Sequence, residues 1–99
     1  MRVNINSVHF KADRKLVSFV NEKLEKLSQF YDGIIGSEVS LKLENGETPD
    51  NKISEIRLMI PGQNLYAKKQ AKTFEESTDS AVEALRIQLI KYKEKKMKK

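Results

Sequence analysis

Two segments of the sequence carry apolar residues at three- and four-residue spacing, and this spacing most strongly limits how the chain can fold. It predicts amphipathic helices over 14–31 and 73–99, each with one face that must be covered. The stripe of the first helix is Leu16, Val20, Leu24 and Leu27, and the stripe of the second is Phe74, Thr78, Val82, Leu85, Leu89 and Tyr92. The remaining chain must therefore supply a surface on which two helices can pack.

Four other segments alternate between apolar and polar residues, which predicts half-buried strands over 2–10, 38–45, 53–60 and 64–71. Turn signals stand between the last three, at Asn45-Gly46 and at Pro61-Gly62. The position of Glu55 predicts that pairing of the third strand begins irregularly. The strands then form one sheet with an apolar face and a polar face.

The sequence also predicts where the first helix begins and ends. Asp13 is a good N-cap residue, and Asp32-Gly33 is expected to end the helix, with Gly33 in the left-handed conformation. The predicted fold is α+β, a two-layer β-α-β-β-β-α domain with a four-stranded sheet and both helices packed on one face. We expect a single domain over 1–99 whose basic end, 95–99, projects and frays.

Composition excludes several classes of function. The 99 residues contain no cysteine, which excludes disulfides and thiolate chemistry, and no long apolar run, so a soluble cytoplasmic protein is the default. The one histidine, His9, has no apparent catalytic partners. Acidic residues at the start of the second helix could be paired carboxylates, but helix N-termini favour acids anyway: Glu75, Glu76, Asp79 and Glu83. We therefore expect no enzyme, no cofactor, no metal ion, no small-molecule substrate and no membrane partner.

Charge is concentrated at the end of the chain. The net charge is +5, and residues 84–99 hold seven cations against one anion, Glu94. Such one-sided basicity is typical of nucleic-acid binding, although a solvated tail would look the same. Packed side by side, the helices would leave a groove in which Lys23 and Lys26 face three cations of the second helix, Arg86, Lys91 and Lys93. Tyr31 or Tyr92 could stack on a base or belong to the core. Lys68, Lys69 and Lys72 could extend the patch or protect an edge strand.

Several segments together resemble the ribosome hibernation-promoting factor family, also called ribosome-associated inhibitor A or sigma-54 modulation proteins. They are RVNINS, LVSFVNEKLEKLSQFYDGI, VSLKLEN and LYAKKQAKTFEESTDSAVEALRIQLIKYKEK. The resemblance implies a layout like that of double-stranded-RNA-binding domains. It also implies binding to rRNA of the small ribosomal subunit in the channel for messenger and transfer RNA. Ribosomes would then stay idle under stress or in stationary phase, and the protein would be a monomer in solution.

The rRNA-binding positions that the resemblance implies are all basic: Lys23, Lys26, Arg86, Lys91, Lys93, Lys95 and Lys96. The chain also departs from the family pattern, because Thr73-Phe74-Glu75 lacks the tyrosine usual in relatives. It ends after the second helix and so looks like a short form. Two other functions stay open from the sequence. One is a protein-interaction module that modulates a transcription factor through the polar sheet face, and the other is a general binder of double-stranded RNA.

Overall fold

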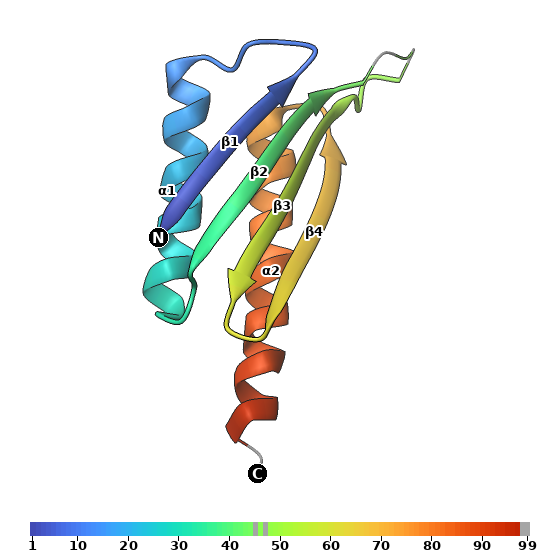
Figure 1. The fold of residues 1–99 in the computed structure, drawn as a ribbon. Helices are drawn as coiled ribbons and strands as arrows, with labels where there is room; N and C mark the ends of the chain where they lie inside the picture. The colour runs from blue at the N-terminus through green and yellow to red at the C-terminus, as the bar shows by residue number, and fades with distance from the viewer. Residues whose placement is uncertain (45, 47, 98–99) are drawn as a thin grey trace.

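The computed structural model describes residues 1–97 apart from 45 and 47, and side chains as far as Lys95. The order of elements is as predicted, β-α-β-β-β-α (Figure 1). The elements are β1 (Arg2–Val8), α1 (Arg14–Phe30), β2 (Gly36–Leu43), β3 (Lys52–Ile60), β4 (Gln63–Ala71) and α2 (Phe74–Met97). The predicted Asn45-Gly46 turn falls on the part of the chain outside this description.

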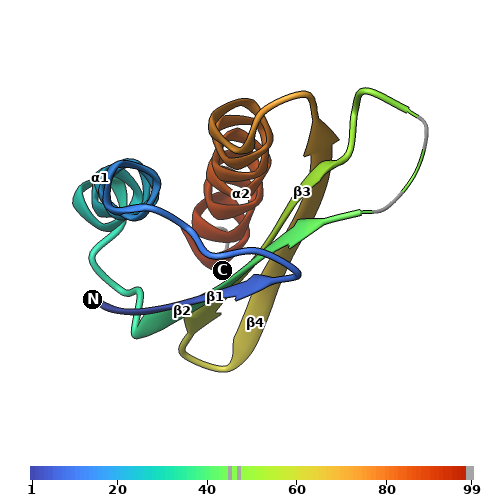
Figure 2. The ribbon, with the colours of Figure 1, turned by 90° about the horizontal axis from the view of Figure 1, so that it is seen from above.

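The four strands form one sheet in the order β1-β2-β3-β4. β1 runs parallel to β2, and the two following pairs are antiparallel. A parallel pair needs a long crossover connection, which α1 provides. Both helices lie on the same side of the sheet, with α1 over the β1 side (Figure 2), so the predicted two-layer architecture is confirmed.

The core lies between the sheet and the helices. Val39, Leu41, Ile56 and Leu58 point inward from the two central strands and are almost completely buried. They meet the predicted stripes of both helices, of which Val20, Leu24, Leu85 and Leu89 are fully buried. The opposite face of the sheet carries charged residues and the half-exposed Tyr66, so the predicted polar face is confirmed.

α2 is anchored to the sheet at its first two turns. Ser54 of β3 lies within hydrogen-bonding distance of Ser77, at 2.7 Å between the hydroxyl oxygens, and of Thr78, at 3.0 Å. All three hydroxyls are buried, so these bonds offset the cost of removing them from water. From this anchor the helix runs the length of the sheet, and its last turns extend beyond the β3–β4 turn (Figure 1).

The helix caps agree with the sequence at one end of α1 and differ at the other. Asp13 caps α1 as predicted, because its carboxylate accepts a hydrogen bond of 2.8 Å from the Leu16 amide. The prediction of a left-handed Gly33 at the end of the helix was wrong. α1 ends through Tyr31 in an extended conformation, with φ −144°. A Cβ at Gly33 would lie 2.7 Å from the Tyr31 ring, so a larger residue there would make the ring shift.

Strand boundaries also differ from the prediction in places. β1 stops at Val8, because His9 takes a positive φ of 72° and turns the chain so that Phe10 stacks on Phe74. The prediction that the pairing of β3 begins irregularly was wrong, because β3 pairs continuously with β2 and β4 from Lys52. Glu55 fits that ladder because it points to the outer face, where Lys42 and Lys68 pair with it. The Pro61-Gly62 turn is confirmed, with Gly62 at φ 87°.

Candidate nucleic-acid interface

A groove between the two helices brings together three of the predicted basic residues. Lys23 and Lys26 of α1 and Arg86 of α2 line a hollow of about 150 Å³ whose floor is Leu27 and Val82. The helical spacing of the two apolar stripes explains this arrangement. Each lysine follows a buried leucine or valine of α1 by two or three positions, so it emerges at the border of the packed face.

Two carboxylates that were not predicted from the sequence share the groove with these cations. Lys23 Nζ lies 2.9 Å from Asp79 Oδ1. Arg86 forms two hydrogen bonds to Glu83, of 3.0 and 3.3 Å. The bond to Arg86 lowers the pKa of the Glu83 carboxyl, and Glu83 in turn raises the pKa of the guanidinium. The carboxylate of each pair is solvent-exposed, so each pair contributes little to stability and its carboxylate can be exchanged for another anion.

Lys93 extends the basic surface of the groove toward the end of α1. Its Nζ lies 4.8 Å from the centre of the Phe30 ring, in a cation–π contact between the two helices. Phe30 stands one turn after Lys26 on α1. Lys26 and Lys93 have no carboxylate partner among the residues that the structure describes. Lys26 and Lys93 therefore present the groove's uncompensated positive charge.

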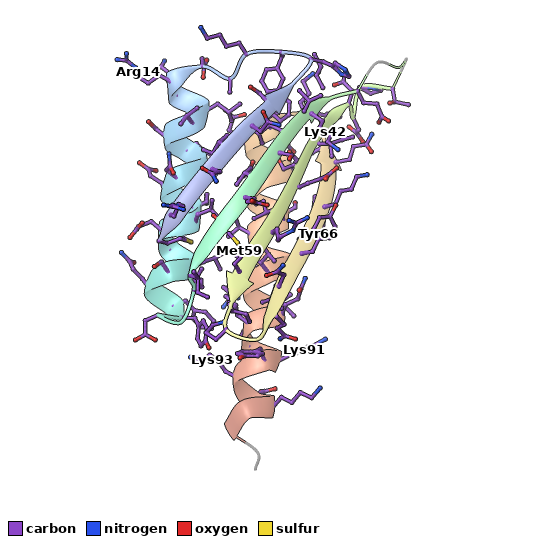
Figure 3. All side chains as sticks on the ribbon, viewed as in Figure 1. Arg14, Lys42, Met59, Tyr66, Lys91 and Lys93 are labelled. Atoms are coloured by element: carbon purple, nitrogen blue, oxygen red, sulfur yellow. The ribbon has the colours of Figure 1, made fainter. Side chains whose placement is uncertain are left out.

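Lys91 and Lys95 lie on the other flank of α2. They border a separate hollow of about 460 Å³, against Gln63 and Leu65 at the start of β4. Figure 3 labels Lys93 and Lys91 on opposite sides of the helix. The prediction that Lys91 faces the lysines of α1 was wrong, because side chains two positions apart on a helix point about 160° apart. The side chain of Lys96 falls outside the description.

The remaining candidates have structural roles or separate positions. Tyr31 and Tyr92 meet edge to face at 6.0 Å and pack against the core, in line with the core alternative. Lys68 points to the outer sheet face, where it lies 3.8 Å from Glu55. Lys69 borders a hollow with Asp79 and Glu83 on the helix side, and the exposed Lys72 follows β4. The three lysines do not make one patch.

One aromatic residue next to the groove was not predicted from the sequence. Phe19 is half-buried on α1, and Lys23 Nζ lies 5.4 Å from the centre of its ring. The signal was present in the sequence, because Phe19 stands one turn before Lys23 and outside the stripe of core leucines.

The fold and the groove together define a small two-layer α+β domain with basic side chains along the junction of its two helices. Comparison with known proteins gives the family. Residues 3–97 match the family described as Sigma 54 modulation protein / S30EA ribosomal protein, and the chain belongs to it. The family resemblance seen in the sequence is confirmed.

Relatives and solved structures agree with this assignment. The chain is 32% identical over 95 residues to a ribosome hibernation promoting factor of Pseudomonas putida, covering 96% of this chain and 89% of that protein. It is 28% identical to the ribosome hibernation promoting factor of Escherichia coli K12, with 96% of each chain covered. A ribosomal subunit interface protein from Coxiella burnetii shares the fold, with a TM-score of 0.82 at 19% identity over 94% of this chain and 98% of that one. The N-terminal domain of Protein Y from Thermus thermophilus also shares it, with a TM-score of 0.79 at 19% identity over 93% and 99%. No helix among the described residues is both long enough and apolar enough to cross a membrane.

Proposed function

We propose that this protein binds the small ribosomal subunit in the channel for messenger and transfer RNA and keeps ribosomes idle under stress or in stationary phase. The observation that carries the proposal is the groove, in which Lys23, Lys26 and Arg86 line one hollow and Lys93 continues the line. The names of the relatives, ribosome hibernation promoting factors, support the same partner.

The mechanism requires no chemistry. The domain occupies space that messenger and transfer RNA need, and phosphates of rRNA bind along the groove. Lys26 and Lys93 bind phosphates directly. Lys23 and Arg86 exchange an exposed carboxylate for a phosphate oxygen at little cost, because surface ion pairs are worth about 0–1 kcal/mol. Phosphate contacts position a protein without reading base sequence, which suits a binder of one folded RNA surface.

A charge-reversal experiment tests the groove. In Lys26→Glu/Lys93→Glu, two cations without carboxylate partners among the described residues change sign, so no carboxylate is left unpaired. The matched control is Lys11→Glu/Lys72→Glu, which makes the same change in net charge at two exposed positions in loops outside the groove. Binding to purified small subunits is measured by co-sedimentation at several salt concentrations.

We expect the groove variant to lose binding at physiological salt while the control is retained. The slope of log affinity against log salt should also become shallower by about 1.4–1.8, since each lost phosphate contact releases about 0.7–0.9 fewer counterions. Equal binding by the groove variant and the wild type would refute the groove as the contact surface.

Two further measurements separate this function from the alternatives. Small subunits already loaded with messenger and transfer RNA should bind the protein poorly if the channel is the site. Equal binding to any naked RNA duplex would favour a general binder of double-stranded RNA. A protein partner that survives ribonuclease treatment in a pull-down would favour the interaction module.

A further inference from the structure

Phe19 differs from the other phenylalanines of the chain in its packing. The sequence contains four, of which Phe74 is buried and Phe10 and Phe30 pack against the core. Phe19 is half-buried and does not belong to the residues packed against that core. An aromatic ring on the surface of α1 is therefore not needed to hold the helix on the sheet.

The surroundings of Phe19 combine an aromatic surface with positive charge. The ring lines an open hollow of about 560 Å³ on α1 together with Arg14, Lys15, Ser18 and Glu22. Lys23 stands over the ring at 5.4 Å and does not line this hollow, so it lies on another side of the ring. Figure 3 shows Arg14 at the first turn of α1, pointing away from the body of the protein.

Lys23 also connects the Phe19 ring to the groove. The same ammonium group that stands over Phe19 lines the groove with Lys26 and Arg86. A strand of RNA whose phosphates lie along the groove would therefore reach Phe19 when it passes Lys23. Arg14 and Lys15 would then face its next phosphates, against the single carboxylate of Glu22.

We propose that Phe19 is a stacking site for one unpaired nucleobase of single-stranded rRNA, with Arg14 and Lys15 on the adjoining phosphates. The proposal rests on the proposed function, because it extends the surface that binds rRNA. Unpaired bases are recognised in proteins by stacking on aromatic rings beside cations, and this arrangement tolerates any base. The ring and the two cations occupy consecutive turns at the start of one helix, so α1 holds them rigidly.

A series of substitutions at one position tests for stacking. Phe19→Leu keeps an apolar side chain but removes the ring, whereas Phe19→Tyr and Phe19→Trp keep an aromatic face. We expect Phe19→Leu to weaken binding to purified small subunits about 5- to 150-fold, the range for loss of one stacked base. The two aromatic variants should stay within about twofold of the wild type. The control is Ile87→Ala, which removes exposed apolar surface from α2 and should leave binding unchanged.

Two readouts separate stacking from simpler explanations. The midpoint of urea unfolding should be the same for Phe19→Leu and the wild type, because the ring lies outside the core. The salt dependence of binding should keep its slope, because no phosphate contact is lost. A photo-crosslinking phenylalanine analogue at position 19 should attach to rRNA, in a product that ribonuclease shortens.

The outcomes distinguish this proposal from the function on which it rests. If the wild type does not bind small subunits, the proposed function fails and the stacking site fails with it. If Lys26→Glu/Lys93→Glu loses binding while Phe19→Leu binds like the wild type, the groove stands and the stacking site is refuted. A crosslink from position 19 to a ribosomal protein would also refute it, as would aromatic variants as weak as Phe19→Leu.

Discussion

Asp79 gives the sharpest test of phosphate binding in the groove, because removing its charge should strengthen binding. Its carboxylate lies 2.9 Å from Lys23 Nζ and competes for the cation that a phosphate would use. The side chain is 62% exposed, so its ion pair contributes at most about 1 kcal/mol to folding. Asp79→Asn should therefore fold like the wild type while it removes a negative charge from the groove.

The gain can be worked out from the geometry. A phosphate oxygen bound to Lys23 would lie about 2.8 Å from Nζ, and the tetrahedral ammonium would hold it about 5 Å from the Asp79 carboxylate. Two unit charges at about 5 Å repel by about 0.8 kcal/mol in water, the dielectric that suits so exposed a side chain. At 0.15 M salt, screening lowers this to about 0.5 kcal/mol. Asp79→Asn should thus bind about fourfold more tightly at low salt and about twofold more tightly at physiological salt.

Glu38→Gln is the matched control. Glu38 pairs with Arg57 at 3.0 Å and is 49% exposed, but it lies on the outer face of the sheet, away from the helices. Glu38→Gln makes the same change in net charge as Asp79→Asn and loses a similar ion pair. Affinity for purified small subunits is measured for both variants by competition with a labelled wild-type protein. If Asp79→Asn binds no more tightly than Glu38→Gln, no phosphate binds at Lys23 and our reasoning about the groove is wrong.

Two further predictions concern stability. Leu85→Ala should lower the free energy of unfolding by about 2–5 kcal/mol in urea titrations, because Leu85 is fully buried between α2 and the sheet. The exposed Ile87 lies two positions later, and Ile87→Ala should stay within about 0.5 kcal/mol of the wild type. The hydrogen bond from Lys42 lowers the pKa of Glu55 below its ordinary value of 4.5. On acidification the Glu55 carboxylate therefore takes up a proton in the unfolded state first, and stability falls as the pH drops from 4.5 through the pKa of the folded state. Glu55→Gln should lack this part of the acid sensitivity in unfolding measured from pH 7 to 3, and equal pH profiles would contradict the ion pair's contribution.

Periodicity was enough to predict the type and order of the elements along the chain, for reasons visible in particular elements. A switch between spacing of two and spacing of three to four marks each change from strand to helix. The buried residues Leu24, Leu41, Ile56 and Leu85 all come from the predicted apolar faces. The order of strands required more, because the sequence does not state that β1 pairs with β2 in parallel.

Local geometry at the ends of the elements was harder to predict than the elements themselves. Gly33 was expected to adopt a left-handed cap, but the helix ends through Tyr31 in an extended conformation, and a Cβ at Gly33 would make the Tyr31 ring shift. His9 takes the positive φ that was expected of glycine, because the turn brings Phe10 onto Phe74. At His9 a tertiary contact therefore decides the conformation over the local preference of the residue.

Helical geometry alone could have predicted more of the candidate site, because it gives the directions of the side chains around α2. Side chains advance by about 100° per residue along a helix. Lys93 and Asp79 each stand seven positions from Arg86, so both point within about 20° of it, whereas Lys91 stands five positions away and points about 140° from it. The spacing alone could therefore have placed an acid beside Arg86 and Lys93 and could have moved Lys91 to another flank. The missing information was which flank of α2 faces α1. That depends on α1 lying over the β1 side of the sheet (Figure 2), since the parallel crossover from β1 to β2 places it there. Topology therefore selects which of the helix's charges act together.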